Sequence, residues 1–296
     1  MAVIPYVSAA SFRAHPTYLD TEGLNLGATS DPEAQTAELT NRLLTASQWA
    51  DDECDQPLAA HVVTQRERTL LNRDGRLTIH ADNTPVRRVG SVGYGWNETA
   101  LTTLENPTVW IEQDANIVAS IANNGSVGWS GSLQFGSPVA GGTIYAQMTY
   151  EAGFAVTLLT EGANEGALQL VVDDPTGIEP GGRYRIWEPA REEAVIVSPD
   201  WTPPPLTTTP EPTVIDLLRP LRYDHDAEHD FSGLPADARL AVVQHTIVQL
   251  MRPDSPAEDE YPDNQAASTR SEDTRTKGMG LLAEARRTLT SYRRVR

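Results

Sequence analysis

Gly233-Leu-Pro-Ala-Asp-Ala-Arg-Leu-Ala-Val-Val-Gln-His-Thr-Ile-Val-Gln-Leu-Met-Arg252 is the stretch on which the fold depends. Pro235 suits the first turn of a helix, because its missing N–H would have no intrahelical partner there. Pro253 ends the helix, because a proline inside a helix loses a hydrogen bond and clashes with the preceding turn. A helix that is apolar on most of its circumference is normally buried. We therefore expect this segment to form the central buried helix of the protein.

The polar side of this helix is narrow. On a helical wheel, only Arg239, Thr246 and Gln249 mark an edge that would face water. His245 lies among apolar positions, and a histidine in such a place is more often a core residue than a ligand. The pattern predicts that His245 is hydrogen-bonded inside the core.

Two further helices are predicted on either side of the sheet-forming region. Asp31 is a suitable N-cap, Pro32 a suitable first helical residue, and a single apolar stripe follows up to Gln56-Pro57. At the other end of the chain, apolar residues share one face and arginines lie mainly off it, which predicts an amphipathic basic helix. Its apolar face consists of Leu281, Leu282, Ala285, Leu289 and Tyr292.

Between residues 62 and 151 the apolar period changes from that of a helix to that of a strand. Residues 62–71, the turn 72–75 and residues 76–80 predict a hairpin. Further short β-like runs follow at 86–89, 91–92, 108–111, 117–118, 132–135 and 143–150. Regularly spaced short strands are typical of an antiparallel sheet or sandwich.

Residues 155–230 carry their own set of strands before the central helix begins. The expected strands are 167–172, 183–187, 193–197 and 213–218, separated by Pro- and Gly-rich turns. We interpret them as a small all-β module inserted into a parent domain made of residues 31–154 and 231–296. The fold class is therefore α+β, with a helical core, an antiparallel sheet or sandwich, and an inserted β-module.

Composition limits the function. The 296 residues include 41 acidic and 23 basic side chains, giving a formal charge of −18, which disfavours tight binding to nucleic acid phosphates. Residues 270–296 hold eight basic and three acidic residues, so this end of the chain has a positive net charge.

Two segments are expected to lack regular structure. We expect residues 1–30 to form an irregular N-terminal arm and residues 254–278 to form an exposed acidic loop. We expect neither a signal peptide nor a membrane span.

The strongest candidate for a metal-binding or catalytic site is the segment 224–230, which has six possible metal ligands, among them His225 and His229. It has no apolar helical stripe, so we favour a solvated polar linker. The single cysteine, Cys54, excludes an intrachain disulfide and a thiolate zinc site. There is no glycine-rich phosphate loop, no Gly-x-Ser-x-Gly and no His-Glu-x-x-His. We expect no enzymatic activity, no cofactor and no bound metal.

The order of these parts resembles the head-tail connector (adaptor) proteins of long-tailed, siphovirus-type bacteriophages. The resemblance covers about two-thirds of the chain and is carried by the order of its motifs. These are the early helix around 39–49, Leu70-Leu-Asn-Arg-Asp-Gly-Arg-Leu-Thr-Ile-His80, Asn83-Thr-Pro-Val-Arg-Arg-Val-Gly-Ser-Val92, Ala146-Gln-Met-Thr-Tyr-Glu-Ala-Gly-Phe154, Leu234-Pro-Ala-Asp-Ala-Arg-Leu-Ala241 and Leu289-Thr-Ser-Tyr-Arg-Arg-Val-Arg296. Residues 155–230 depart from it and look like the small β-barrel inserts of phage structural proteins.

The resemblance implies a structural virion protein at the head–tail interface, assembled in the host cytoplasm. It would form a homo-oligomeric ring, a dodecamer, bound to the portal protein on one side and to the tail terminator or next neck protein on the other. Genomic DNA would pass through the lumen without specific binding, and no membrane would be involved. An acidic wall would repel the phosphates and let the DNA slide.

The same resemblance suggests how the subunit is anchored. The basic C-terminal helix would bind an acidic or carbonyl-rich surface of the portal, where guanidinium groups form paired hydrogen bonds. The candidate portal-binding residues are Arg286, Arg287, Tyr292, Arg293, Arg294 and Arg296. This hypothesis predicts that deleting residues 281–296 leaves a folded protein that no longer joins portal-bearing heads.

Two other function classes remain open at this point. The chain could be another tail or baseplate protein that uses the inserted module to bind host glycan. It could also be a metal-dependent hydrolase with His225 and His229 as ligands. Glycan binding and metal content, respectively, would distinguish these from a connector.

Overall fold

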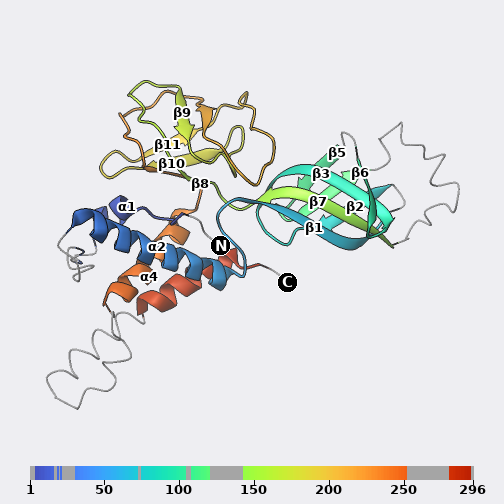
Figure 1. Ribbon diagram of the computed structural model, residues 1–296, viewed down its shortest axis with the longest axis horizontal. Coiled ribbons are helices and arrows are strands. Elements are labelled where there is room, and N and C mark those ends of the chain that lie inside the picture. The colour runs from blue at the N-terminus through green and yellow to red at the C-terminus, as the bar shows by residue number, and fades with distance from the viewer. Residues whose placement is uncertain are drawn as a thin grey trace, which may run out of the picture.

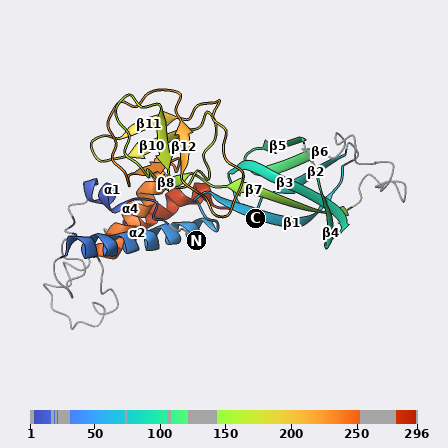
Figure 2. The same ribbon diagram turned by 45° about the horizontal axis from the view of Figure 1, so that its top comes forward.

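The computed structural model describes residues 4–16, 19, 21, 31–72, 75–104, 108–120, 143–251 and 280–294. The fold is mixed α+β, and all its sheets are antiparallel. Helices and the small strands β8–β13 lie side by side at one end of the long axis, and strands β1–β7 extend toward the other end (Figures 1 and 2). The molecule is therefore elongated.

The predicted first long helix is confirmed as α2 (Pro32–Cys54). The Asp31 side chain accepts a hydrogen bond from the Glu33 backbone N–H, and Pro32 occupies the first helical turn. The apolar stripe is buried as expected from its spacing; its members Leu39, Leu43, Ala46, Ala50 and Cys54 are all 0% exposed.

The central stretch forms α4 (Ala236–Met251), but its predicted polar edge is wrong. Arg239 is 4% exposed and Thr246 is fully buried, whereas Leu240 is 41% exposed. The Arg239 guanidinium is compensated by Asp230 at 2.9 Å, and the Thr246 hydroxyl donates to the backbone oxygen of Val242. Polar groups with such partners can be buried, so polarity alone did not show which side of α4 faces water.

One hydrophobic cluster joins the helices. It contains residues of α1 (Ala9–Ala14), α2, α4 and the C-terminal helix 280–289, where Ala285 and Leu289 are 0% exposed. The last helical turn continues into η1 (Thr290–Tyr292). The amphipathic C-terminal helix predicted from the sequence thus packs through its apolar face.

The N-terminal residues are not the irregular arm that the sequence predicted. Residues 9–14 form α1, and Tyr6 and Phe12 are 0% exposed. The Tyr6 hydroxyl donates to Asp51 Oδ1 at 2.5 Å, and burial raises the pKa of this tyrosine. Asp51 is 8% exposed, so this carboxylate of α2 is buried together with Tyr6. Burial raises the pKa of the Asp51 carboxyl as well.

Two sheets share a second hydrophobic cluster at the other end of the molecule. The first sheet has the order β1-β7-β3-β4 and the second β2-β6-β5. The strands are β1 (His61–Leu70), β2 (Arg76–His80), β3 (Val86–Asn97), β4 (Ala100–Thr103), β5 (Thr108–Glu112), β6 (Asn116–Ser120) and β7 (Thr143–Ala152). The expected strands at 108–111, 117–118 and 143–150 are confirmed, the two expected runs 86–89 and 91–92 belong to the one strand β3, and the run 132–135 lies outside the described residues.

The predicted hairpin of residues 62–71 and 76–80 is largely wrong. All ten residues of β1 pair with β7, and β2 pairs with β6 in the other sheet. The described backbone pairing between the two segments is limited to the bridge Leu71–Leu77, supplemented by side-chain hydrogen bonds from Thr69 to the Thr78 carbonyl and from Gln65 to the His80 carbonyl. Leu77 and Ile79 are 0% exposed because β2 crosses to the second sheet and faces the first. The chain reverses where the sequence predicted, since the Gly75 N–H donates to the Asn72 carbonyl at 3.1 Å, but the long-range partner of β1 was not visible in local sequence.

Residues 155–230 form the strands that the sequence predicted. They are β9 (Gln169–Val172), β10 (Arg183–Trp187), β11 (Glu193–Ile196) and β12 (Thr213–Asp216). Two short strands, β8 (Val156–Leu158) and β13 (Asp230–Ser232), were missed. The sheets have the orders β11-β10-β13-β8 and β12-β9, and in this fully described segment they do not close into a barrel.

Glu151 and Gly153 determine how the sheet passes into residues 155–230. Gly153 has φ +103, and a Cβ there would lie 2.6 Å from the backbone oxygen of Ala59, so only glycine fits. Glu151, 2% exposed, accepts from Arg88 at 3.0 Å and from the Gly177 N–H at 2.5 Å. These contacts tie β7 to the segment that follows it.

Two expectations were an exposed acidic loop at residues 254–278 and the absence of a membrane span. The acidic segment 254–278 lies outside the described residues. Among the helices that are described, none combines the length and the apolar character that a membrane span requires.

Candidate functional site

The basic C-terminal segment is anchored to the protein's own body. The backbone N–H of Arg294 donates to the Cys54 carbonyl at the end of α2 at 2.9 Å, and Gln56 Nε2 donates to the Tyr292 carbonyl at 2.8 Å. Together with the buried Ala285 and Leu289, these bonds fix the segment along its length. The side chains that it presents therefore have defined positions.

Two of the predicted portal-binding arginines bind Glu53 instead. Arg286 Nε donates to Glu53 Oε1 at 2.8 Å, and Arg293 Nε donates to the Glu53 backbone oxygen at 2.7 Å. Glu53 lies in the last turn of α2, where the free carbonyls carry partial negative charge. Both guanidinium groups thus neutralise the C-terminal end of a helix.

Tyr292 and Arg294 are also engaged within the chain. The Tyr292 hydroxyl donates to Asp237 Oδ1 at 2.7 Å, and burial followed by this hydrogen bond raises the pKa of the phenol. The Arg294 guanidinium binds the Asp82 carboxylate. Among the predicted residues, Arg287 alone is exposed with no hydrogen bond or ion pair to the described part of the chain. Arg296 lies outside the described residues.

The structure contradicts the expectation that residues 281–296 can be deleted from a folded protein. Ala285 and Leu289 belong to the hydrophobic cluster that joins the helices, and both are 0% exposed. Deleting them would expose α2 and α4 to water. A test of partner binding at this end therefore needs single surface substitutions.

A cavity of about 720 Å³ lies between the C-terminal segment and the edge of the β-sheets. It is lined by Gln56, His80, Ala81, Thr84, Pro85, Arg87, Gln113, Asp114, Ala115, Asn116, Phe154, Ser291, Tyr292, Arg293 and Arg294. Arg87 lies over the Phe154 ring at 5.2 Å and donates to the Gly153 carbonyl at 3.1 Å. A lining of arginines, amides and backbone groups is suited to a polar segment of a partner chain.

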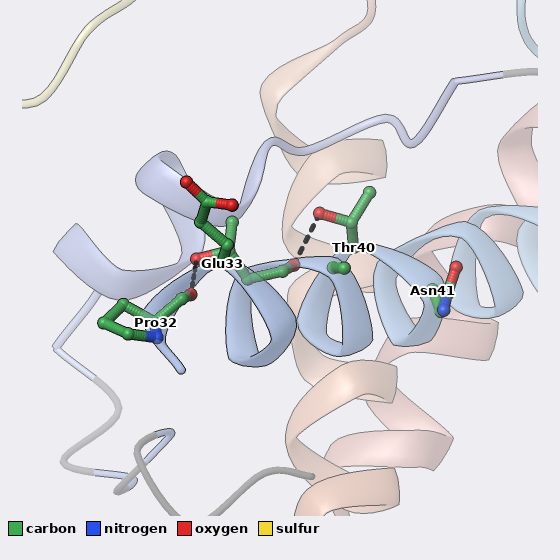
Figure 3. A pocket seen from close by; sticks show the side chains of 6 residues that line it. Pro32, Glu33, Thr40 and Asn41 are labelled. Carbon is green, nitrogen blue, oxygen red and sulfur yellow. Dashed lines mark hydrogen bonds between the residues drawn. The ribbon is translucent and has the colours of Figure 1, made fainter. Parts of the chain in front are cut away.

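The first part of α2 has a separate, open depression of about 560 Å³. Figure 3 shows the side chains that line it, with Thr36 donating to the Pro32 carbonyl and Thr40 to the Thr36 carbonyl. Both bonds are local to the helix. Among the described residues of this lining, Glu33 alone is ionisable, so these residues do not form an acid–base pair.

The histidine-rich segment 224–230 is not the fully solvated linker that we expected. His225 is 2% exposed, and its Nδ1 lies 2.7 Å from Glu188 Oε2. Its Nε2 lies 3.5 Å from Glu193 Oε2. Glu188, Asp226 and His229 each place one possible metal ligand within 4.8 Å of the others. Glu188 comes 37 residues before His225, so no local pattern indicated that they meet.

Within the described residues, no hydrogen bond holds His245, although the sequence predicted one. Its ring stacks on Trp49 of α2, with centroids 4.1 Å apart and planes 9° apart, and its Nδ1 has no hydrogen-bond partner in the described residues. Burial, with nearby Arg286 as the second cause, lowers the pKa of His245 to about 4. The neutral ring acts as a flat packing surface between two helices.

No protein-family model matches the chain, and no curated protein matches it significantly.

Proposed function

We propose that this chain is a structural subunit of a bacteriophage neck. It forms a homo-oligomeric ring that joins the portal of the DNA-filled head to the tail and lets DNA pass through its lumen. The ring would be a dodecamer located in the virion at the head–tail interface. The proposal rests on the order of sequence motifs described above and on the physical features of the folded chain.

The observation that carries the proposal is the exposure of large apolar side chains at separate places on an elongated subunit. Leu70 and Trp96, 58% and 56% exposed, lie toward the far end of the β1-β7-β3-β4 sheet. A second group, Leu168, Val214 and Leu218, is 53%, 47% and 49% exposed on or beside β9 and β12. A closed ring with head-to-tail contacts needs two different complementary surfaces on each subunit. Separated apolar groups are suited to that role.

The division of the chain into packed units supports the same proposal. The hydrophobic cluster of residues 155–231 is separate from the cluster that joins α1, α2, α4 and the C-terminal helix. In the proposal, these helices form the connector core, and residues 155–230 are an insert related to small β-barrels but left open. The insert would face the next neck protein or the outside of the ring.

Charge supports free passage of DNA. A net charge of −18 on each subunit gives a ring a strongly negative field, which repels phosphates and prevents the polyanion from adhering. Arg287 is the exposed cation that we assign to the portal contact, since Arg286, Arg293 and Arg294 are neutralised within the subunit.

The decisive experiment is electron microscopy of phage particles assembled without this protein. Full heads separated from tails are expected, and intact tailed virions would refute the proposal. Complementation with R287E should leave heads and tails unjoined, because the substitution reverses the exposed charge. R286Q is the matched control: it removes a neighbouring cation that already binds Glu53, so joining should persist.

Ring formation is tested separately with the purified protein. Light scattering and negative-stain images should show closed rings for the wild type. W96D and V214D each place a charge on one of the exposed apolar groups, so rings should be lost if these groups form subunit contacts. A monomer at all concentrations, with or without purified portal, would count against the proposal.

A further inference from the structure

We propose that Glu188, Asp226 and His229 form a binding site for one divalent transition-metal ion of the Zn²⁺ or Mn²⁺ type. One ligand atom from each residue lies within 4.8 Å of the other two. Glu188 Oε1 and His229 Nε2 are 3.7 Å apart, too far for a hydrogen bond. Two ligands of one tetrahedral zinc ion are about 3.4 Å apart, given metal–ligand bonds of about 2.1 Å. The two atoms are thus spaced to share an ion.

The register of the sheet brings Glu188 and His229 together. In the β10–β13 pair, Trp187 lies opposite Asp230. The next positions outward are Glu188 and His229, which face each other across the end of the pair. Side chains of directly opposed residues point to the same face of an antiparallel sheet. Two of the three ligands are therefore the residues directly next to the last backbone pair of β10 and β13.

The third ligand comes from a short loop held at both ends. His225 and Ala163 exchange backbone hydrogen bonds of 2.7 and 2.8 Å. At the other end of the loop, the Leu159 carbonyl accepts from the Glu228 N–H at 2.8 Å, and the Leu159 N–H donates to the His229 carbonyl at 2.9 Å. Glu228 has φ +67, a left-handed conformation that turns the chain back. This turn places the exposed Asp226 carboxylate beside His229 and leaves the site open to solvent on that side.

Buried groups around the three ligands support the assignment. His225, whose side chain is 0% exposed, lies 2.7 Å from Glu188 Oε2 through Nδ1 and leaves Glu188 Oε1 for the ion. Its Nε2 and the Nδ1 of His229 are buried without hydrogen-bond partners in the described residues. A ligating carboxylate held by a neighbouring hydrogen-bond donor is the usual arrangement around protein-bound metals.

Arg191 is the group that competes with an ion. Its Nη1 lies 3.6 Å from Glu188 Oε1 and donates to the Asp224 carbonyl at 3.1 Å. The Arg191 side chain is 48% exposed, so the guanidinium can move into solvent when a cation arrives. In an ion-pair network without a metal, the positive charge of Arg191 would stabilise the cluster of acidic side chains. In a metal site, Arg191 competes with the ion and lowers the affinity for it.

The donor set selects the class of ion. One imidazole nitrogen and two carboxylate oxygens suit zinc, manganese and iron(II), whereas calcium requires about six to eight oxygen ligands. Three protein ligands leave at least one position for water. The ion would join the end of β10 to the loop before β13 and so stabilise the module, independently of ring formation.

The test is metal binding by the full-length protein, measured by calorimetry with Zn²⁺ and Mn²⁺ and by metal analysis after dialysis. We expect one ion for each chain. D226N and H229Q should weaken binding by about tenfold or more. E228Q is the matched control, because it removes one carboxylate from the same loop but none of the three ligands. Asp226 is exposed, so D226N tests the site even if H229Q does not fold.

R191Q separates the two interpretations. It should tighten metal binding, and added Zn²⁺ should raise the melting temperature of the wild type and R191Q but not of D226N, with the rise reversed by EDTA. The proposal is overturned if the wild type retains no ion, if D226N and E228Q bind equally, or if R191Q binds more weakly than the wild type.

Discussion

The guanidinium of Arg239 donates to the carboxylate of Asp230 at 2.9 Å, and both side chains are 5% exposed. The same carboxylate accepts from the Ser8 backbone N–H, and Arg239 also donates to the Tyr6 carbonyl at 2.6 Å. One buried ion pair therefore holds together the N-terminal segment, the last strand of the inserted module and the central helix.

Breaking this pair from one side should be costly. R239M is expected to lower the free energy of unfolding by about 3–5 kcal/mol, because the Asp230 carboxylate stays buried without its cation. The double variant D230N/R239M should lose less free energy of unfolding than the two single variants together. Urea denaturation of the wild type, D230N, R239M and the double variant measures this. Additive losses would mean that the two groups do not interact.

The stacked pair of Trp49 and His245 predicts acid sensitivity. The pKa of His245 is lowered from 6.5 to about 4 in the folded protein, so between these values the unfolded chain binds a proton that the folded chain does not. Stability should therefore fall as the pH drops from about 6.5 toward 4. H245F keeps a ring against Trp49 and removes the proton, so its urea midpoint should change less than that of the wild type between about pH 7.5 and pH 5. Equal changes in both proteins would assign the acid sensitivity to other groups.

Two adjacent arginines of β3 provide an internal comparison of buried and exposed ion pairs. Arg88 binds Glu151, whose side chain is 2% exposed, whereas Arg87 binds Glu179, whose side chain is 35% exposed. E151A should lower the free energy of unfolding by about 2–3 kcal/mol, because Arg88 and the Gly177 N–H lose a charged acceptor. E179A should cost less than about 1 kcal/mol. Chemical denaturation measures both, and similar losses would contradict the difference in burial.

The C-terminal helix should contribute to stability through its apolar face. L289A is expected to lower the free energy of unfolding by about 2–5 kcal/mol, because the Leu289 side chain is 0% exposed between helices. L240A, on the exposed side of α4, should change stability by no more than about 0.5 kcal/mol. The reverse order of the two effects in thermal or urea melts would show that the orientation of these helices is different.

Local sequence was sufficient for the longer helices and strands, but not for α1, β8 and β13 or for the pairing of the strands. The N-cap at Asp31, the apolar face of the C-terminal helix and the strands of residues 167–218 followed from short-range rules of capping, periodicity and turn chemistry. The pairing of β1 with β7 did not, because the two strands are separated by the rest of the sheet-forming region. A turn signal shows that the chain reverses, and the strands then pair according to the packing of whole sheets.

The candidate sites show the same division. The sequence identified His225 and His229 as possible ligands and the C-terminal arginines as a basic group. It could not show that Glu188 Oε1 lies 3.7 Å from His229 Nε2, or that Glu53 and Asp82 neutralise three of the arginines. An acid that is distant in sequence gives no periodic signal near the residue that it contacts.

By itself the sequence determined the α+β composition, the main helices and strands and the acidic balance of the chain. Tertiary structure decided which polar groups are buried, which strands pair and which cations remain free. The physical reason is that helix and strand formation depends on residues within one or two turns. Burial of a charge such as Arg239 depends on whether the fold brings an Asp230 within hydrogen-bonding distance.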